Sequence, residues 1–129
     1  KKYVAITLLV GISLDTLHTG DIDKLFIREA TEWVVDNTPD DAKIVSNDKY
    51  IAYFSQRDID WSTALRHEFK WQAITESRRN WQSVDYLVIY VRNRDDRRWD
   101  AFMQANGLSE LKSFQGGNSE KGRVVIVAL

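Results

Sequence analysis

The chain has no cysteine, and its 129 residues include only one proline, one methionine and two histidines. Without cysteine, it can form no disulfide, no thiolate metal ligand and no cysteine nucleophile. The two histidines, His18 and His67, lack the spacing of a paired metal site, so no metal is expected. No G-x-S-x-G elbow, Walker A loop or dinucleotide fingerprint occurs either. We therefore expect no catalytic residue and no cofactor.

An excess of charge of one sign is also missing. Lys and Arg total 18 and Asp and Glu total 19, which leaves a net charge of -1. Such a balance produces no broad positive field, so nucleic acid is not an expected partner. The length and the hydrophobic content of 43% are ordinary for one globular domain.

The longest apolar stretch lies at the start, in residues 3–14. A membrane-spanning helix needs about 20 residues, so these dozen cannot cross a bilayer alone. Two interpretations are open. The β-branched content favours a buried or edge strand, whereas the apolar character also suits the end of a membrane helix. Such a segment would also offer a surface for oligomerisation.

Periodicity and turn signals then predict the elements of the remaining chain. A helix from Ile22 to about Thr38, with Asp21 as its N-cap, should end before Pro39. Residues 50–55 are either a helical turn or a strand. The other expected elements are strands at 43–48 and 83–91, helices at about 62–74 and 95–106, and two strands at 111–115 and 123–129.

This order predicts an α/β fold, because helices and strands alternate. We expect a three-layer Rossmann-like domain with a mostly parallel sheet, helices on both faces and a C-terminal antiparallel β-hairpin. Residues 21–129 would form this single domain, and residues 1–20 the apolar segment and a linker.

The candidate ligand-binding residues are Asn47, Asp48, Arg57 and Arg92. In open α/β sheets, ligands bind beyond the carboxyl ends of strands. Asn47 and Asp48 lie at the C-terminal end of one predicted strand, and Arg92 follows another. The alternative for Asp48 is a cap of the next segment. For Arg92 the alternative is a solvated loop, since the charges of residues 92–96 nearly cancel.

One part of the chain resembles a known family. The residues are 28–30, 33, 37–48, 52–55 and 57, within IREATEWVVDNTPDDAKIVSNDKYIAYFSQR. They resemble the segment after the last membrane helix of bacterial glycosyltransferases similar to dolichyl-phosphate-mannose–protein mannosyltransferases and aminoarabinose lipid A transferases. Two departures are Gln56, where the pattern often has glycine, and Phe54, where it has a second tyrosine.

The resemblance implies a non-catalytic accessory domain on the periplasmic face of the bacterial inner membrane. Residues 3–14 would then be the end of a membrane helix. The parent enzyme would use a polyprenyl-phosphate-sugar donor, and its catalytic residues would lie outside these 129 residues. Expected partners are the membrane part of the same polypeptide and a lipid-linked sugar or acceptor. The alternative is a free-standing Rossmann-like module that binds a small molecule or a protein.

Overall fold

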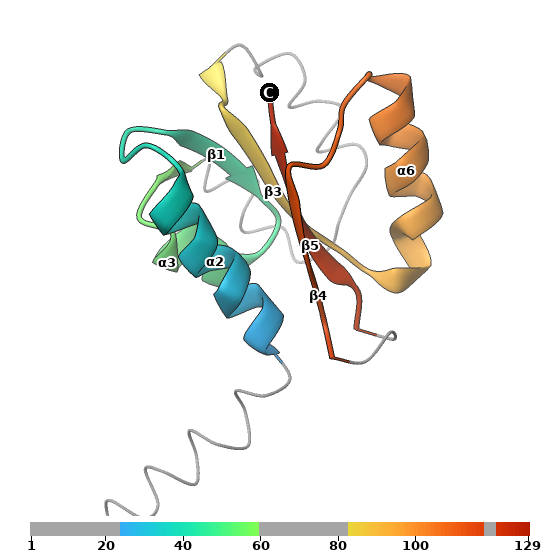
Figure 1. Ribbon diagram of the computed structural model, residues 1–129, viewed down its shortest axis with the longest axis horizontal. Coiled ribbons are helices and arrows are strands. Elements are labelled where there is room, and N and C mark those ends of the chain that lie inside the picture. Colours follow the sequence, from blue (N-terminus) through green and yellow to red (C-terminus); the bar gives the residue numbers. More distant parts are fainter. Residues whose placement is uncertain (1–23, 60–82, 118–120) are drawn as a thin grey trace, which may run out of the picture.

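The computed structural model describes residues 24–59, 83–117 and 121–129. In chain order, the elements are α2 (Leu25–Asn37), β1 (Lys43–Ser46), α3 (Lys49–Phe54), β2 (Asp58–Ile59), β3 (Tyr86–Val91), the 3-10 helix η3 (Asn93–Asp95), α6 (Asp96–Ala105), β4 (Lys112–Gln115) and β5 (Arg123–Ala128) (Figure 1). The predicted helix at 62–74 and the apolar segment 1–20 lie outside the described residues. Within these described ranges, no helix has both the length and the apolar character required to cross a membrane.

The helix α2 ends where the sequence predicts. Its last residue is Asn37, and Thr38 is already extended at φ -120° and ψ 152° because proline disfavours helix in the preceding residue. The carbonyl of Val34 accepts both the backbone N–H of Thr38 at 3.1 Å and the Thr38 hydroxyl at 2.6 Å, which caps the end of the helix. The turn closes with a hydrogen bond from the Ala42 N–H to the Pro39 carbonyl.

The segment at 50–55, which the sequence left open, is helical rather than extended. It forms the short helix α3, of which Ile51 and Ala52 are buried. The sheet strand that follows it, β2, is only two residues long and was not predicted.

The five strands lie in the order β2-β1-β3-β5-β4. Strand β1 runs parallel to both β2 and β3, whereas β5 runs antiparallel to both β3 and β4. The antiparallel ladders contain six and four residue pairs, against three and two in the parallel ladders. The sheet is therefore mixed and mainly antiparallel.

The prediction of a mostly parallel, Rossmann-like fold is thus wrong. The last strand does not stay at the sheet edge beside β4 but inserts between β3 and β4. The physical reason is its composition, because Val124, Val125, Ile126 and Val127 are all fully buried. A strand that is apolar on both faces gains most by lying in the centre, whereas the polar β4 (KSFQ) tolerates the edge.

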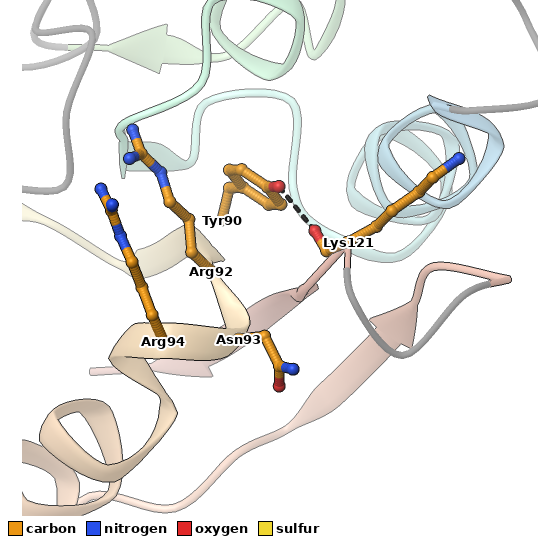
Figure 2. A pocket seen from close by; sticks show the side chains of 5 residues that line it. All are labelled: Tyr90, Arg92, Asn93, Arg94 and Lys121. Carbon is orange, nitrogen blue, oxygen red and sulfur yellow. Dashed lines mark hydrogen bonds between the residues drawn. The ribbon is translucent and has the colours of Figure 1, made fainter.

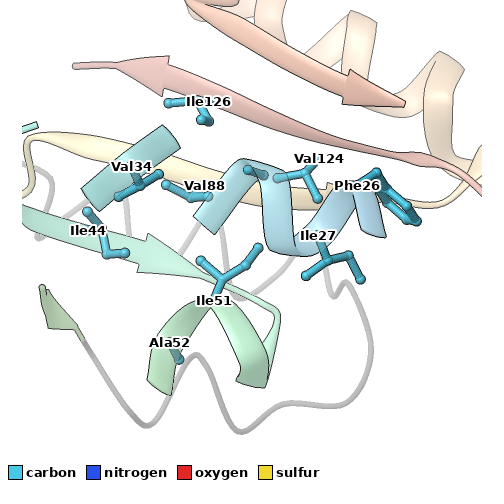
Figure 3. Close-up of a cluster of buried hydrophobic side chains, with 10 residues drawn as sticks. Phe26, Ile27, Val34, Ile44, Ile51, Ala52, Val88, Val124 and Ile126 are labelled. Carbon is cyan, nitrogen blue, oxygen red and sulfur yellow. The ribbon is translucent and has the colours of Figure 1, made fainter. Parts of the chain in front are cut away.

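One face of the sheet is covered by α2 and α3 (Figure 3). Phe26, Ala30 and Val34 recur every four residues and form the buried stripe of α2. They pack against sheet residues that include Val88 and Ile126. The full cluster comprises Phe26, Ile27, Ala30, Val34, Ile44, Ile51, Ala52, Val88, Val124 and Ile126.

The opposite face is covered by α6 (Figure 1). Trp99 is fully buried there, and its ring lies 5.5 Å from that of Phe102. The helix stops at Gly107, as predicted, in a left-handed conformation with φ 62°. The N–H groups of Gly107 and Leu108 donate to the carbonyls of Gln104 and Met103, which completes a Schellman motif.

Candidate functional site

Asn47 lies at the end of β1, and its side chain is a structural link to β3. The amide nitrogen donates to the Tyr90 carbonyl at 2.9 Å, and the amide oxygen accepts from the Tyr90 N–H at 2.8 Å. The side chain therefore extends the pairing of the two parallel strands by one step. Both ends of this amide bind the backbone, so the structure places Asn47 in the scaffold.

Asp48 is the N-cap of α3. Its Oδ1 atom accepts from the backbone N–H groups of Tyr50 at 2.9 Å and Ile51 at 3.1 Å. Its own N–H donates to the hydroxyl of Ser46. Of the two interpretations from the sequence, this geometry is that of the cap.

Arg57 is buried and holds the C-terminal end of α2. Its Nη2 atom donates to the carbonyls of Val35 at 2.8 Å and Thr38 at 2.9 Å, and Nε donates to the Thr38 hydroxyl at 3.1 Å. A cation at the last carbonyls of a helix also interacts favourably with the helix dipole. Asp40 lies 3.6 Å from the guanidinium but is fully exposed, so water screens that pair.

Arg92, which the sequence predicted as a ligand-binding residue, lies in a pocket. The pocket has a volume of about 520 Å³ and lies at the carboxyl end of β3. Its lining residues are Tyr90, Arg92, Asn93, Arg94 and Lys121 (Figure 2). Asn47 is bonded to the backbone of one of them, Tyr90, while Asp48 and Arg57 are not among the lining residues.

Two of the three cationic side chains extend to the same side of this pocket. Figure 2 shows Arg92 and Arg94 pointing in one direction and the Lys121 side chain pointing in another. Lys121 instead contributes its carbonyl, which accepts the Tyr90 hydroxyl at 2.6 Å. The pocket is thus defined mainly by two guanidinium groups, and we call it the Arg92–Arg94 pocket.

Gly122 is what brings Lys121 to the end of β3. Its φ is 83°, and a Cβ atom at this position would lie 2.3 Å from the Val91 carbonyl oxygen. Only glycine can pass this close to the neighbouring backbone. The close approach sets the boundary of the pocket on the side of β5.

Arg94 was not predicted as a site residue, because the acidic residues beside it nearly cancel the positive charge of this segment. The structure separates these charges only in part. Asp96 binds Arg123 on β5 at 3.0 Å, whereas Asp95 forms a long ion pair of 3.9 Å with Arg94. The Arg94 side chain stays 69% exposed. The alternation of arginines at 92 and 94 was the available signal, but the partner of Asp96 lies 27 residues away.

A second cluster of charge lies beside the pocket and is internally balanced. Arg123 contacts Asp96, Asp100 and Glu110, and Glu110 also accepts the indole N–H of Trp99 at 3.3 Å. Burial lowers the pKa of Arg123, but hydrogen bonds to Asp96 and Glu110 outweigh it and raise the pKa above its ordinary value. This cluster joins α6 to β5 and offers no unmatched cation.

No group of three His, Asp or Glu side chains that could hold a metal occurs in the part of the chain that the structure describes. Both histidines lie outside it. The site is therefore a polar pocket with an arginine pair and no assembled catalytic group among its lining residues.

No protein-family model, curated protein or solved structure matches this chain. The resemblance of residues 28–57 to glycosyltransferase domains therefore remains a hypothesis, and the function has to be inferred from the geometry of the site.

Proposed function

We propose that this domain is a non-catalytic binding module whose ligand carries a phosphate-like anion, held in the Arg92–Arg94 pocket. The observation that carries the proposal is the pair of guanidinium groups that extend together into a pocket of about 520 Å³. Guanidinium groups match the geometry of phosphate oxygens and donate two parallel hydrogen bonds to them.

The surroundings of the pocket favour an anion over a cation. The carboxylate of Asp96 is engaged by Arg123, and that of Asp95 is paired with Arg94 at 3.9 Å. Three of the five lining residues, Arg92, Arg94 and Lys121, are cations, whose side chains only donate hydrogen bonds. The position at the carboxyl end of a strand is also where sheets commonly bind ligands.

We also propose that the anion belongs to a lipid-linked sugar, and that the domain is the periplasmic accessory domain of a membrane glycosyltransferase. The residues of the resemblance support this in one respect. Gln56 has φ 54°, a conformation that favours glycine, and glycine is what the family pattern often has there. Asp48 and Arg57, which belong to the same pattern, hold the scaffold together, which agrees with chemistry located elsewhere in a larger protein.

The second candidate is a free-standing module for a small anionic molecule. Its support is the volume of the pocket, about 520 Å³, which is typical of sites that bind small molecules. The two candidates share the same site and differ in the size and character of the ligand.

Calorimetric titration with geranyl phosphate, geraniol and inorganic phosphate tests the proposal. Each lost charge-assisted hydrogen bond costs about 1.5 to 3 kcal/mol, so the double variant Arg92→Gln/Arg94→Gln should bind geranyl phosphate at least tenfold more weakly. The control Arg97→Gln/Arg98→Gln removes the same charge from the exposed side of α6 and should bind within about twofold of the original chain.

The outcomes separate the candidates. Tighter binding of geranyl phosphate than of inorganic phosphate favours the lipid-linked ligand, and equal binding favours the small-molecule module. Failure of both phosphates, or equal losses in the two double variants, would overturn the anion site. The coding sequence upstream of Lys1 provides an independent check, since the glycosyltransferase proposal requires several membrane segments there.

A further inference from the structure

The short helix α3 presents a cluster of aromatic rings to solvent. Tyr50, Tyr53 and Phe54 are 39%, 69% and 50% exposed. The ring of Phe54 lies 4.4 Å from that of Tyr50 and 4.9 Å from that of Tyr53, measured between centroids. Isolated exposed apolar residues are normal, but three exposed rings on six residues, joined through Phe54, form a patch that indicates an interaction site.

Two of these rings form one wall of a groove between α2 and α3. The groove has a volume of about 420 Å³. Its lining residues are Arg28, Thr31, Glu32, Val35, Asp36, Tyr50, Phe54 and Gln56. We call it the α2–α3 groove. The third ring, Tyr53, is the most exposed of the three but does not line the groove.

The opposite wall comes from α2 and is polar apart from Val35. Residues 28, 31, 32, 35 and 36 recur at helical spacing and therefore share one side of that helix. Arg28 donates to Glu32 at 2.8 Å, and both side chains remain more than half exposed. Asp36 and the amide of Gln56 add further groups that can bind hydroxyls.

We propose that the α2–α3 groove binds a saccharide. A pyranose has an apolar C–H face and an edge of hydroxyls, and the groove has an aromatic wall facing a wall of carboxylate, guanidinium and amide groups. The negative face of an aromatic ring attracts polarised C–H groups, so Phe54 and Tyr50 would stack on the sugar face. Glu32 and Asp36 would accept hydrogen bonds from its hydroxyls.

Other occupants fit this groove less well. A phosphate would meet Glu32 and Asp36 against the single cation Arg28, which is already paired. An anionic membrane surface would be repelled by the same carboxylates, although tyrosines suit the lipid interface. An apolar helix of a partner would leave these polar groups buried without hydrogen bonds. The proposal does not depend on the Arg92–Arg94 pocket, because the two sites share no residue.

The test is saturation-transfer and amide-shift NMR on the 129-residue chain with methyl α-mannopyranoside, methyl β-glucopyranoside and methyl β-galactopyranoside. At least one glycoside should bind with a Kd of about 1 to 10 mM and shift amide signals in α2 and α3. Phe54→Ala should weaken binding about tenfold, the effect of removing one stacking ring from a small ligand. The control Tyr53→Ala, a larger exposed ring beside the groove, should change binding less than about twofold.

Asp36→Asn provides a second variant that removes a charge but keeps the shape, and we expect weakening of about threefold or more. Both substituted side chains are exposed, so circular dichroism should show an intact fold. Arg92→Gln/Arg94→Gln should leave glycoside binding unchanged, which separates failure of this inference from failure of the anion site.

Several outcomes would overturn the inference. These are the absence of saturation transfer with all three glycosides, equal binding by the Phe54 and Tyr53 variants, and shifts confined to β3 and α6. Binding to phosphatidylglycerol vesicles that is lost in Phe54→Ala, without glycoside binding, would assign the groove to a membrane instead.

Discussion

Arg57 and Arg94 are both arginines that follow a helix or a strand, yet they lie in opposite environments. The Arg57 side chain is 3% exposed and donates to backbone carbonyls at the end of α2, whereas the Arg94 side chain is 69% exposed beside a pocket. The first stabilises the scaffold, and the second lines the pocket that we propose binds an anion. The comparison shows that the surrounding acceptors, rather than the residue type, decide what an arginine does.

The largest effect is expected from Arg57→Ala. It removes four hydrogen bonds and leaves the carbonyls of Val35 and Thr38 without their buried donor. We expect the free energy of unfolding to fall by about 3 kcal/mol or more. Urea unfolding followed by circular dichroism measures it. The control Arg97→Ala, on an exposed side of α6, should change it by less than about 0.5 kcal/mol. A similar loss of unfolding free energy in the two variants would contradict the different roles of the buried and the exposed arginine.

A smaller loss is expected from Asn47→Ala, which removes both hydrogen bonds to the Tyr90 backbone and leaves those groups partly buried. The expected fall in unfolding free energy is about 2 kcal/mol. Amide hydrogen exchange should show faster exchange at Tyr90, because its N–H loses its acceptor. Asn93→Ala, an exposed asparagine at the same end of the sheet, is the control and should leave that exchange unchanged.

A gain in stability is expected from Gln56→Gly. A residue other than glycine at φ 54° is strained by about 1 kcal/mol, and glycine relieves this strain. Glycine also gives the unfolded chain more conformational freedom, which offsets part of the stabilisation. The net gain should be about 0.5 kcal/mol, measured as a rise in the midpoint of urea unfolding. Gln104→Gly, inside α6, should have the opposite sign and cost about 1 kcal/mol. A loss at both positions would mean that the backbone strain at Gln56 is smaller than the entropy that glycine adds to the unfolded chain.

The smallest effect on stability is expected from the double variant of the Arg92–Arg94 pocket, which should have the largest effect on phosphate binding. Arg92→Gln/Arg94→Gln should change the unfolding free energy by less than about 0.5 kcal/mol while removing the phosphate affinity. A loss comparable to that of Arg57→Ala would show that this pair also belongs to the scaffold. Thermal melts with and without phosphate measure both quantities in one sample.

The candidate site could be predicted from the sequence only in part. Arg92 was found from its place after a strongly apolar strand, and Asp48 had the cap as its stated alternative because a cap acts within three residues of the chain. Asn47 acts through a partner 43 residues away, and Arg57 acts mainly through partners 19 and 22 residues away. No local pattern contains such partners, so the sequence does not distinguish these two from ligand-binding residues.

The sequence by itself determined the local elements: the stripe of α2, its end before Pro39, the apolar strand β3 and the stop of α6 at Gly107. Each depends on residues within one or two turns of the chain, where backbone sterics and hydrophobic period decide. Only the tertiary structure decided that β5 inserts beside β3, which makes the sheet mainly antiparallel. The position of β5 depends on which distant strands can pair with it and bury its two apolar faces. The same position brings Arg123 of β5 against Asp96, while Arg92 and Arg94 line the pocket.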